Sequence, residues 1–220
     1  MCGRYTLSQA QRLQEIYAKI DNEGLLAPRY NVAPTQTVPL VLDESPDTLS
    51  GARWGLIPFW ANDKKIGASL INARCETVAV KPAFRTAFKK RRCLIPADGF
   101  YEWQKVGAAK IAHRIMVGDG LFYFAGLWET WNAPEGGPLR SCTIITTTPN
   151  AVTAPIHDRM PVILPPTAQS AWLSRETPPE ALEALLVPHS ADGMRAYPVS
   201  SRVNTPRNQD AALIEPAGTD

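Results

Sequence analysis

The stretch RCLIPADGFYEWQ, residues 92–104, predicts a strand, a turn and a second strand. Its two halves are apolar or aromatic, and ADG between them is typical of a turn. On the N-terminal side, Phe84 and Phe88 stand four residues apart after Pro82 and predict a short helix. On the C-terminal side, AHRIMV (112–117) and LFYFAGLWET (121–130) flank GDG and predict a hairpin.

The rest of the chain continues this alternation of short strands and helices. Ser8 and Gln11 resemble a capping box that begins an amphipathic helix ending at Gly24. Further strands are predicted at VPLVL (38–42), in ARWGLIPFW (52–60) with its end at Pro58, and at 141–148, 159–164 and 195–203, and a proline-started helix at 177–186. We expect one α+β domain over residues 1–204, with a curved, largely antiparallel, barrel-like sheet and short helices packed outside. Residues 205–220 are expected to form a loose tail.

Composition and charge exclude several classes of protein. With 220 residues, 45% of them hydrophobic and 20% charged, the chain is typical of a globular domain. A net charge of +2 and a pI of 8.4 are too mild to indicate a nucleic-acid binder by themselves. No apolar run reaches membrane-span length and no signal peptide is apparent, so we expect a cytoplasmic protein with no membrane partner. The four cysteines lack CxxC spacing, so neither zinc nor a disulfide framework is expected.

The basic residues are concentrated in one acid-free run between Glu76 and Asp98. Such a run is consistent with a solvated helix face or with a surface that contacts phosphates. It contains Lys81, Arg85, Lys89, Lys90, Arg91 and Arg92.

Cys2 is the most reactive residue of the chain if Met1 is removed. Its free α-amine and its thiol would then form a β-aminothiol, which condenses with an aldehyde to a five-membered thiazolidine. An α-amine of pKa 7.7–8.0 is roughly 10 to 20% unprotonated at pH 7, whereas a lysine is below about 0.1%. An unperturbed thiol adds a few per cent of thiolate. The other interpretation is an incidental cysteine at a frayed terminus.

Other polar groups lie in apolar stretches that could carry chemistry. Glu102, between aromatics, is suited to proton transfer by a raised pKa, or else is buried beside an arginine. His157 precedes the strand at 159–164 and could move protons near pH 7, although a lone histidine is often structural. Asn72 and Arg74 alternate in INARCET (71–77) and would share one face. Trp60 and Trp103, at ends of elements, could stack on a base.

With these residues in place, the chain resembles the SRAP family, the SOS-response-associated peptidases or abasic-site processing proteins. The resemblance covers residues 2 to 204 in order. It is carried by MCGRY (1–5), RYNVAPTQ (29–36), RWGLIPFW (53–60), INARCET (71–77), FRTAFKKRRCLIPADGFYEW (84–103), FAGLWE (124–129) and HDRMPVIL (157–164), and more weakly by PVSSRVN (198–204).

The resemblance implies covalent capture of an abasic site in single-stranded DNA during the response to DNA damage. Cys2, after Met1 is removed, would form the thiazolidine with the sugar aldehyde. Asn72 would hold the terminal amine, Glu102 would transfer protons, and His157 would assist sugar ring opening and reversal of the crosslink.

The resemblance also implies a set of DNA contacts. Arginines would bind phosphates beside the lesion, and the other contacts would shape the strand and stack on bases at its break. The phosphate-binding candidates are Arg4, Arg74 and Arg159; the others are Asn31, Pro34, Trp60 and Trp103. We expect no cofactor and no metal, a monomer, and association with the nucleoid when damaged DNA is bound.

Two other functions remain open from the sequence. In the first, Cys2 is the N-terminal nucleophile of a peptidase, with its own amine as base. In the second, the arginines and tryptophans bind single-stranded DNA without a covalent bond. Removal of Met1 by the protein itself is compatible with the first function and with crosslinking, so the enzyme class is expected to be hydrolase or lyase.

Overall fold

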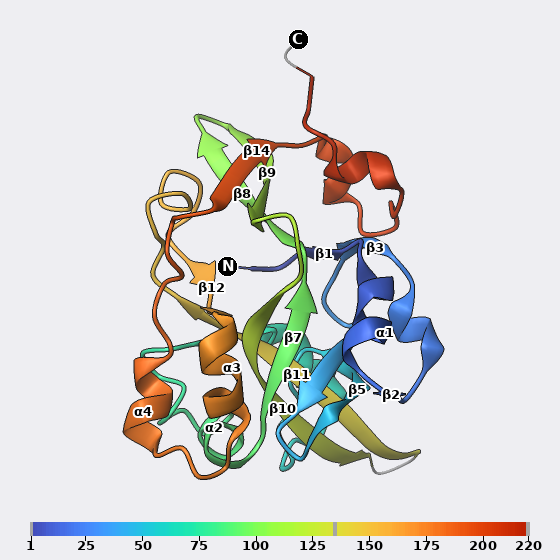
Figure 1. The fold of residues 1–220 in the computed structure, drawn as a ribbon, viewed down its shortest axis with the longest axis vertical. Helices are drawn as coiled ribbons and strands as arrows, with labels where there is room; N and C mark the ends of the chain where they lie inside the picture. Colours follow the sequence, from blue (N-terminus) through green and yellow to red (C-terminus); the bar gives the residue numbers. More distant parts are fainter. Residues whose placement is uncertain (1, 134–135, 219–220) are drawn as a thin grey trace.

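The computed structural model of the chain describes residues 2–133 and 136–218 (Figure 1). The strands are β1 (Tyr5–Leu7), β2 (Lys19–Ile20), β3 (Arg29–Val32), β4 (Thr37–Leu42), β5 (Ser45–Trp54), β6 (Asn72–Arg74), β7 (Arg92–Ala97), β8 (Gly99–Val106), β9 (Ala109–Val117), β10 (Phe122–Ala133), β11 (Gly137–Thr147), β12 (Met160–Pro161), β13 (Ile163–Leu164) and β14 (Met194–Pro198). The helices are α1 (Leu13–Ile16), α2 (Arg85–Lys90), α3 (Pro166–Leu173) and α4 (Pro179–Ala184). Short 3-10 helices are η1 (Ala10–Arg12), η2 (Glu23–Leu26), η3 (Lys64–Ser69), η4 (Ser201–Asn204) and η5 (Ala211–Ile214).

Five strands close into a barrel in the order β11, β10, β7, β4 and β5. Antiparallel pairs join successive strands, and a parallel pairing of Ser141 with Arg53 brings β11 back to β5. Closure pairs backbone groups that would otherwise lie at open edges. The predicted α+β class with a largely antiparallel, barrel-like sheet is confirmed.

The barrel core fixes the start of the chain. Tyr5 of β1 is fully buried, and its ring lies 5.4 Å from that of Trp54 and 5.8 Å from that of Phe124. Burial of one aromatic side chain contributes about 1.5 to 3 kcal/mol. Cys2, three residues earlier, is therefore anchored to the barrel instead of lying in a frayed terminus.

A second sheet, in the order β14, β9, β8, β1 and β3, lies across one end of the barrel (Figure 1). A buried network ties β1 to the start of β8: Asp98 accepts from the Thr6 hydroxyl at 2.6 Å and pairs with Arg114 at 3.2 Å. Breaking such a buried pair leaves a charge without compensation, which is strongly destabilising. The network therefore sets where the N-terminal residues lie relative to β8.

The predicted hairpin of residues 112–130 is wrong. Strand β9 pairs with β8 and β14, whereas β10 pairs with β7, β11 and β13 in the other sheet. The glycines around Asp119 do make a turn, with Gly118 at φ +57°. A turn signal is local, and partners distant in sequence determine which strands pair on either side of it.

The N-terminal helix is much shorter than predicted. Helices η1 and α1 together cover only Ala10–Ile16, Ile20 already lies in β2, and the separate 3-10 helix η2 begins at Glu23. The Ser8 hydroxyl donates to Asp98 at 2.8 Å, so it anchors this segment to the start of β8 instead of capping a helix.

Helices α2, α3 and α4 lie together beside the barrel (Figure 1). The helix expected around Phe84 and Phe88 corresponds to α2, and the proline-started helix corresponds to α4. Helix α3, which was not predicted, places Trp172 in the core, where its indole N–H donates to the Cys93 carbonyl at 3.0 Å. No helix in the described ranges is long and apolar enough to cross a membrane.

The C-terminal segment differs from the loose tail expected after Asn204. Residues 205–218 include η5, whose Leu213 is fully buried, and Val199 forms a β-bridge with Pro216. Figure 1 shows this segment, in red, beside β3. Residues 219–220 lie outside the described ranges.

Candidate functional site

Asn72 holds the backbone of Cys2. Strand β6 pairs in parallel with β11, with Asn72 opposite Ile144, and this pairing directs its amide to the N-terminal residues. Its Nδ2 donates to the Cys2 carbonyl at 2.8 Å. Its buried Oδ1 accepts no hydrogen bond from a residue in the described ranges, so it is available to a further donor.

The Cys2 thiol is fully buried, and the backbone amide of Arg4 donates to its sulfur. Burial raises the pKa of this thiol well above its ordinary value, and the nearby Glu102 carboxylate raises the pKa further. The sequence predicted a few per cent of thiolate at Cys2 near pH 7. In the folded chain the thiol is neutral at this pH. A neutral thiol is a poor first nucleophile, so the α-amine of a mature Cys2 is the better candidate.

Glu102 lies on β8 with 2% of its surface exposed. The Tyr101 amide donates to the Arg4 carbonyl at 2.9 Å, which joins this part of β8 to the N-terminal residues. Burial raises the pKa of Glu102 to about 7. Near neutral pH the carboxyl is thus about half protonated, as a group that both donates and accepts protons must be.

His157 faces Glu102 from the loop before β12. Its Nε2 lies 3.8 Å from Glu102 Oε2. The Arg159 amide donates to Nδ1 at 3.0 Å, which places the proton of a neutral ring on Nε2. Asp158 Oδ1 also lies 2.9 Å from Nδ1, but Nδ1 cannot accept from Arg159 and donate to Asp158 at once. The bond to the backbone is held by the chain, whereas the Asp158 side chain is 88% exposed and can rotate. We therefore assign the proton to Nε2.

Burial lowers the pKa of His157, so the imidazole is neutral near pH 7 and its Nε2–H is a hydrogen-bond donor on the side of Glu102. Glu102 and His157 also line a pocket of about 460 Å³, together with Trp103, Lys105, Lys110, Ile156 and Asp158. Two groups suited to proton transfer thus meet at a concave surface beside the Cys2 backbone.

Three of the predicted DNA contacts are occupied by contacts within the protein. Arg4 donates to Asn31 Oδ1 at 2.8 Å and to the Val203 carbonyl at 2.7 Å. Asn31 is fully buried, which argues against direct contact with DNA. Arg159 binds Glu76 with two hydrogen bonds, at 2.5 and 3.0 Å, and lowers the pKa of that carboxyl to about 2.

The other four are accessible. Trp60 is 49% exposed, Arg74 is exposed, and Pro34 and Trp103 are half-buried. Trp103 also lies against the Arg4 guanidinium, 5.9 Å from its ring centre, and its indole N–H donates to Asn204 Oδ1 at 2.7 Å. Arg4 and Trp103 therefore form one unit supported by the C-terminal segment.

Asn31 attaches that segment to β3. Its Nδ2 lies within 3.1 to 3.2 Å of the carbonyls of Val203, Thr205 and Asn208. These contacts are distant in sequence and were not anticipated, because an asparagine in a short strand carries no pattern that names its partners.

Asn31→Ala is expected to destabilise the fold by about 3 kcal/mol, since it leaves several buried polar groups unsatisfied. Chemical denaturation would show a lower midpoint than that of the wild type. Asn62→Ala, at an exposed position, serves as the matched control and should leave the midpoint unchanged. Equal midpoints for Asn31→Ala and the wild type would contradict an anchoring role.

The basic residues between Glu76 and Asp98 have different surroundings in the folded chain. Arg92 is fully buried and donates to backbone carbonyls, those of Phe88 and Trp172 among them. Arg91 pairs with Glu129 at 2.7 Å. Part of the run is therefore structural.

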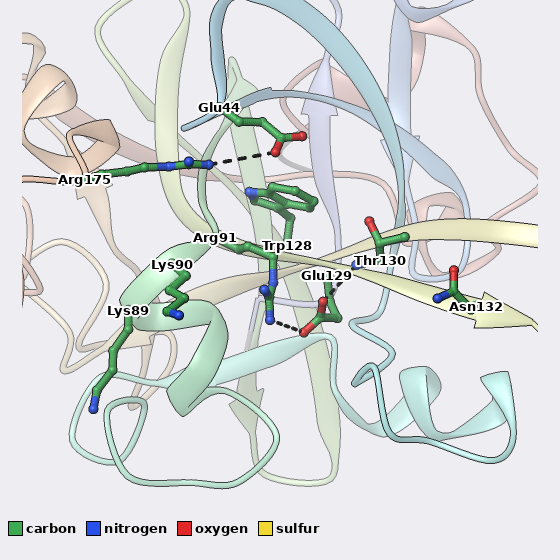
Figure 2. Close-up of a pocket in the computed structure, with 9 residues that line it drawn as sticks. All are labelled: Glu44, Lys89, Lys90, Arg91, Trp128, Glu129, Thr130, Asn132 and Arg175. Carbon is green, nitrogen blue, oxygen red and sulfur yellow. Dashed lines mark hydrogen bonds and ion pairs between the residues drawn. The ribbon is translucent and has the colours of Figure 1, made fainter.

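Lys89 and Lys90, also in the run, line a separate pocket of about 760 Å³. Figure 2 shows this pocket with Trp128 between the Arg91–Glu129 and Arg175–Glu44 ion pairs. It is larger than the pocket at His157, but none of the candidate site residues lines it. We therefore place the chemistry at the smaller pocket, where Glu102 and His157 meet.

Sequence reasoning missed Lys105, Lys110 and Asn204. The two lysines lie at the end of the β8–β9 hairpin, and the pairing of those strands would have revealed them. Nothing in the sequence signals Asn204 as the partner of Trp103.

Comparison with known proteins agrees with the resemblance inferred from the sequence. A family model described as SOS response associated peptidase (SRAP) matches residues 1–206. The abasic site processing protein YoqW of Bacillus subtilis is 50% identical over 223 residues, which cover 98% of this chain and 99% of YoqW. The abasic site processing protein HMCES of Gallus gallus is 31% identical, with 98% of this chain and 78% of HMCES covered. A crystal structure of a protein from Bacteroides thetaiotaomicron superimposes with a TM-score of 0.90 at 29% identity, covering 98% of this chain and all of the other.

Proposed function

The chain belongs to the SOS response associated peptidase (SRAP) family, and from this premise we propose that it processes abasic sites in single-stranded DNA. The mature N-terminal Cys2 forms a covalent thiazolidine with the lesion aldehyde and so shields it. The observation that carries this proposal is the convergence of Asn72, Glu102 and His157 on the N-terminal residues. Asn72 can orient the amine, Glu102 can protonate the carbinolamine hydroxyl, and His157 can assist opening of the closed sugar.

The first step is opening of the sugar, which exists mainly as a hemiacetal. The neutral His157 donates a hydrogen bond from its Nε2–H to the ring oxygen, solvent takes the proton of the anomeric hydroxyl, the carbonyl forms, and the ring oxygen leaves with a proton from solvent. The lowered pKa of His157 supports this role, because it keeps the ring neutral with its proton on Nε2.

The second step joins the amine to the aldehyde. The Cys2 amine attacks the carbonyl carbon to form a carbinolamine, and Asn72 Oδ1 accepts a hydrogen bond from the amine and so orients it. Protonated Glu102 then delivers its proton to the carbinolamine hydroxyl, which leaves as water. A carboxyl with a pKa of about 7 holds enough of its acid form for this transfer.

The third step closes the ring. Glu102 is now a carboxylate and can accept the proton of the Cys2 thiol while the sulfur bonds to the imine carbon. Loss of water left the nitrogen with one proton, as an iminium, so ring closure turns it into the neutral ring amine without a further proton. The sum is one aldehyde plus one aminothiol giving one thiazolidine and one water, and the neutral, buried thiol suits attack at this last stage.

The peptidase alternative needs a thiolate at the outset. Because burial raises the pKa of Cys2, the structure offers no particular support for a thiol that turns over peptides. Hydrolysis of the Met1–Cys2 bond remains part of the proposal as the step that frees the amine. We propose that the protein acts as a monomer.

A denaturing gel tests the proposal with two single-stranded oligonucleotides of one sequence, one intact and one with a single abasic site. We expect a heat-stable, slowly migrating band with the abasic strand alone. Equal retention of both strands under native conditions, with no band on the denaturing gel, would instead indicate non-covalent binding.

A further inference from the structure

We propose that Lys105 and Lys110 form a phosphate subsite that holds the DNA backbone beside the lesion. The inference rests on the proposed function, because the DNA strand supplies the phosphate. It adds two residues that neither the sequence motifs nor the predicted contacts include.

The register of the β8–β9 hairpin places the two lysines directly opposite each other. Lys105 lies two residues after Trp103 on β8, so both side chains leave the same face of the strand. Two like charges opposite each other destabilise a strand pair. An anion between them converts that repulsion into attraction.

Both lysines line the same pocket as Glu102 and His157. A volume of about 460 Å³ is within the range of sites that bind small molecules, so the pocket has room for one nucleotide unit. A strand whose abasic sugar reaches the proton-transfer groups must continue past them on one side. The two ammonium groups lie on a wall of that same concave surface.

The charges of the pocket favour an anion. Neither lysine forms an ion pair with a carboxylate in residues 2–133 and 136–218, whereas Arg91 and Arg175 in the pocket of Figure 2 are both paired. Asp158 is an opposing full negative charge on the wall of this pocket. Glu102 adds about half a negative charge near pH 7. The two lysines therefore outweigh the acidic groups.

The test is the salt dependence of binding to an intact single-stranded oligonucleotide, followed by fluorescence anisotropy. Each phosphate contact with a single strand contributes about −0.7 to the slope of log K against log salt. The double variant Lys105→Gln/Lys110→Gln is expected to flatten this slope by about 0.7 relative to wild type, because the two lysines share one phosphate. The variant Lys105→Arg/Lys110→Arg should restore the wild-type slope, because it restores both charges.

Lys89→Gln/Lys90→Gln is the matched control, since these lysines line the pocket in Figure 2. It should leave the slope unchanged. A second arm uses oligonucleotides with one neutral methylphosphonate linkage, moved stepwise along the strand. At one position this neutral linkage should flatten the wild-type slope of log K against log salt. At the same position it should leave the slope of the Lys105→Gln/Lys110→Gln variant unchanged.

An unchanged slope in Lys105→Gln/Lys110→Gln, in a protein that still crosslinks abasic DNA, overturns the subsite and leaves the proposed function standing. If the slope of log K against log salt is flattened by Lys89→Gln/Lys90→Gln instead, the subsite at Lys105 and Lys110 is overturned. The phosphate contacts would then lie on the basic run between Glu76 and Asp98. Failure of the wild type to crosslink abasic DNA would be a separate result and would count against the proposed function itself.

Discussion

Replacing Cys2 by alanine is expected to abolish the heat-stable adduct with abasic single-stranded DNA. Alanine keeps the α-amine, so an imine can still form, but no sulfur is available to close the ring. Imines hydrolyse during heating, whereas a thiazolidine persists. The measurement is a denaturing gel of heated samples, run with and without borohydride reduction before heating. The expected adduct of the variant appears only after reduction.

Cys75→Ala is the matched control, because Cys75 is partly exposed and lies three residues after Asn72. It should crosslink as the wild type does. An N-terminal extension that is not removed should abolish the heat-stable adduct, as Cys2→Ala does. Unlike Cys2→Ala, it should also prevent the reducible adduct, since the amine is then in a peptide bond. A heat-stable adduct from Cys2→Ala would contradict thiazolidine formation.

Replacing Glu102 by glutamine is expected to slow crosslinking by about 100-fold, at the lower end of the range for general acid–base catalysis. Glutamine has nearly the same size and keeps a hydrogen-bonding group, but it transfers no proton. The loss should appear in the rate of adduct formation under saturating protein. Binding to an intact oligonucleotide should be unaffected.

The rate of crosslinking is expected to depend on pH in a defined direction. The pKa of Glu102 is raised to about 7 by burial, so its acid form is lost as pH rises through 7. The amine, with an ordinary pKa of about 7.7 to 8.0, becomes reactive over the same range. The wild-type rate is therefore expected to pass through a maximum at about pH 7 to 8. Glu102→Gln should lose the fall on the alkaline side and rise to a plateau.

Glu129→Gln is the control for this experiment. Burial raises the pKa of Glu129 as well, but that residue pairs with Arg91 in the pocket of Figure 2. Its substitution should leave both the rate and the pH profile unchanged. A wild-type rate and profile for Glu102→Gln would remove Glu102 from the chemistry.

Much of the fold could be predicted from local patterns. Apolar runs located β4, β7 and β8, and the Phe84–Phe88 spacing located α2. The pairing of β9 and β10 could not be predicted, because strand partners are decided by the closure of the barrel and the register of distant segments. For the same reason, the docking of residues 205–218 was missed: its anchor, Asn31, is about 175 residues away in sequence.

The site was partly predictable. Glu102 and His157 stood out as polar groups in apolar surroundings, and Cys2 for its position. Their convergence depends on β1, β6 and β8 meeting in space, which no local pattern shows. The direction of the Cys2 pKa could not be predicted either, since burial of the thiol is a property of the folded chain.

The intact mass of the adduct tests the central claim most directly. Wild-type protein is incubated with a single-stranded oligonucleotide that carries one abasic site, heated, and treated with iodoacetamide under denaturing conditions before mass measurement. The account predicts the mass of the chain without Met1 plus the oligonucleotide minus one water, with three alkylated cysteines, because the fourth sulfur is in the ring. An adduct in which all four cysteines are alkylated, or one that retains Met1, would contradict it.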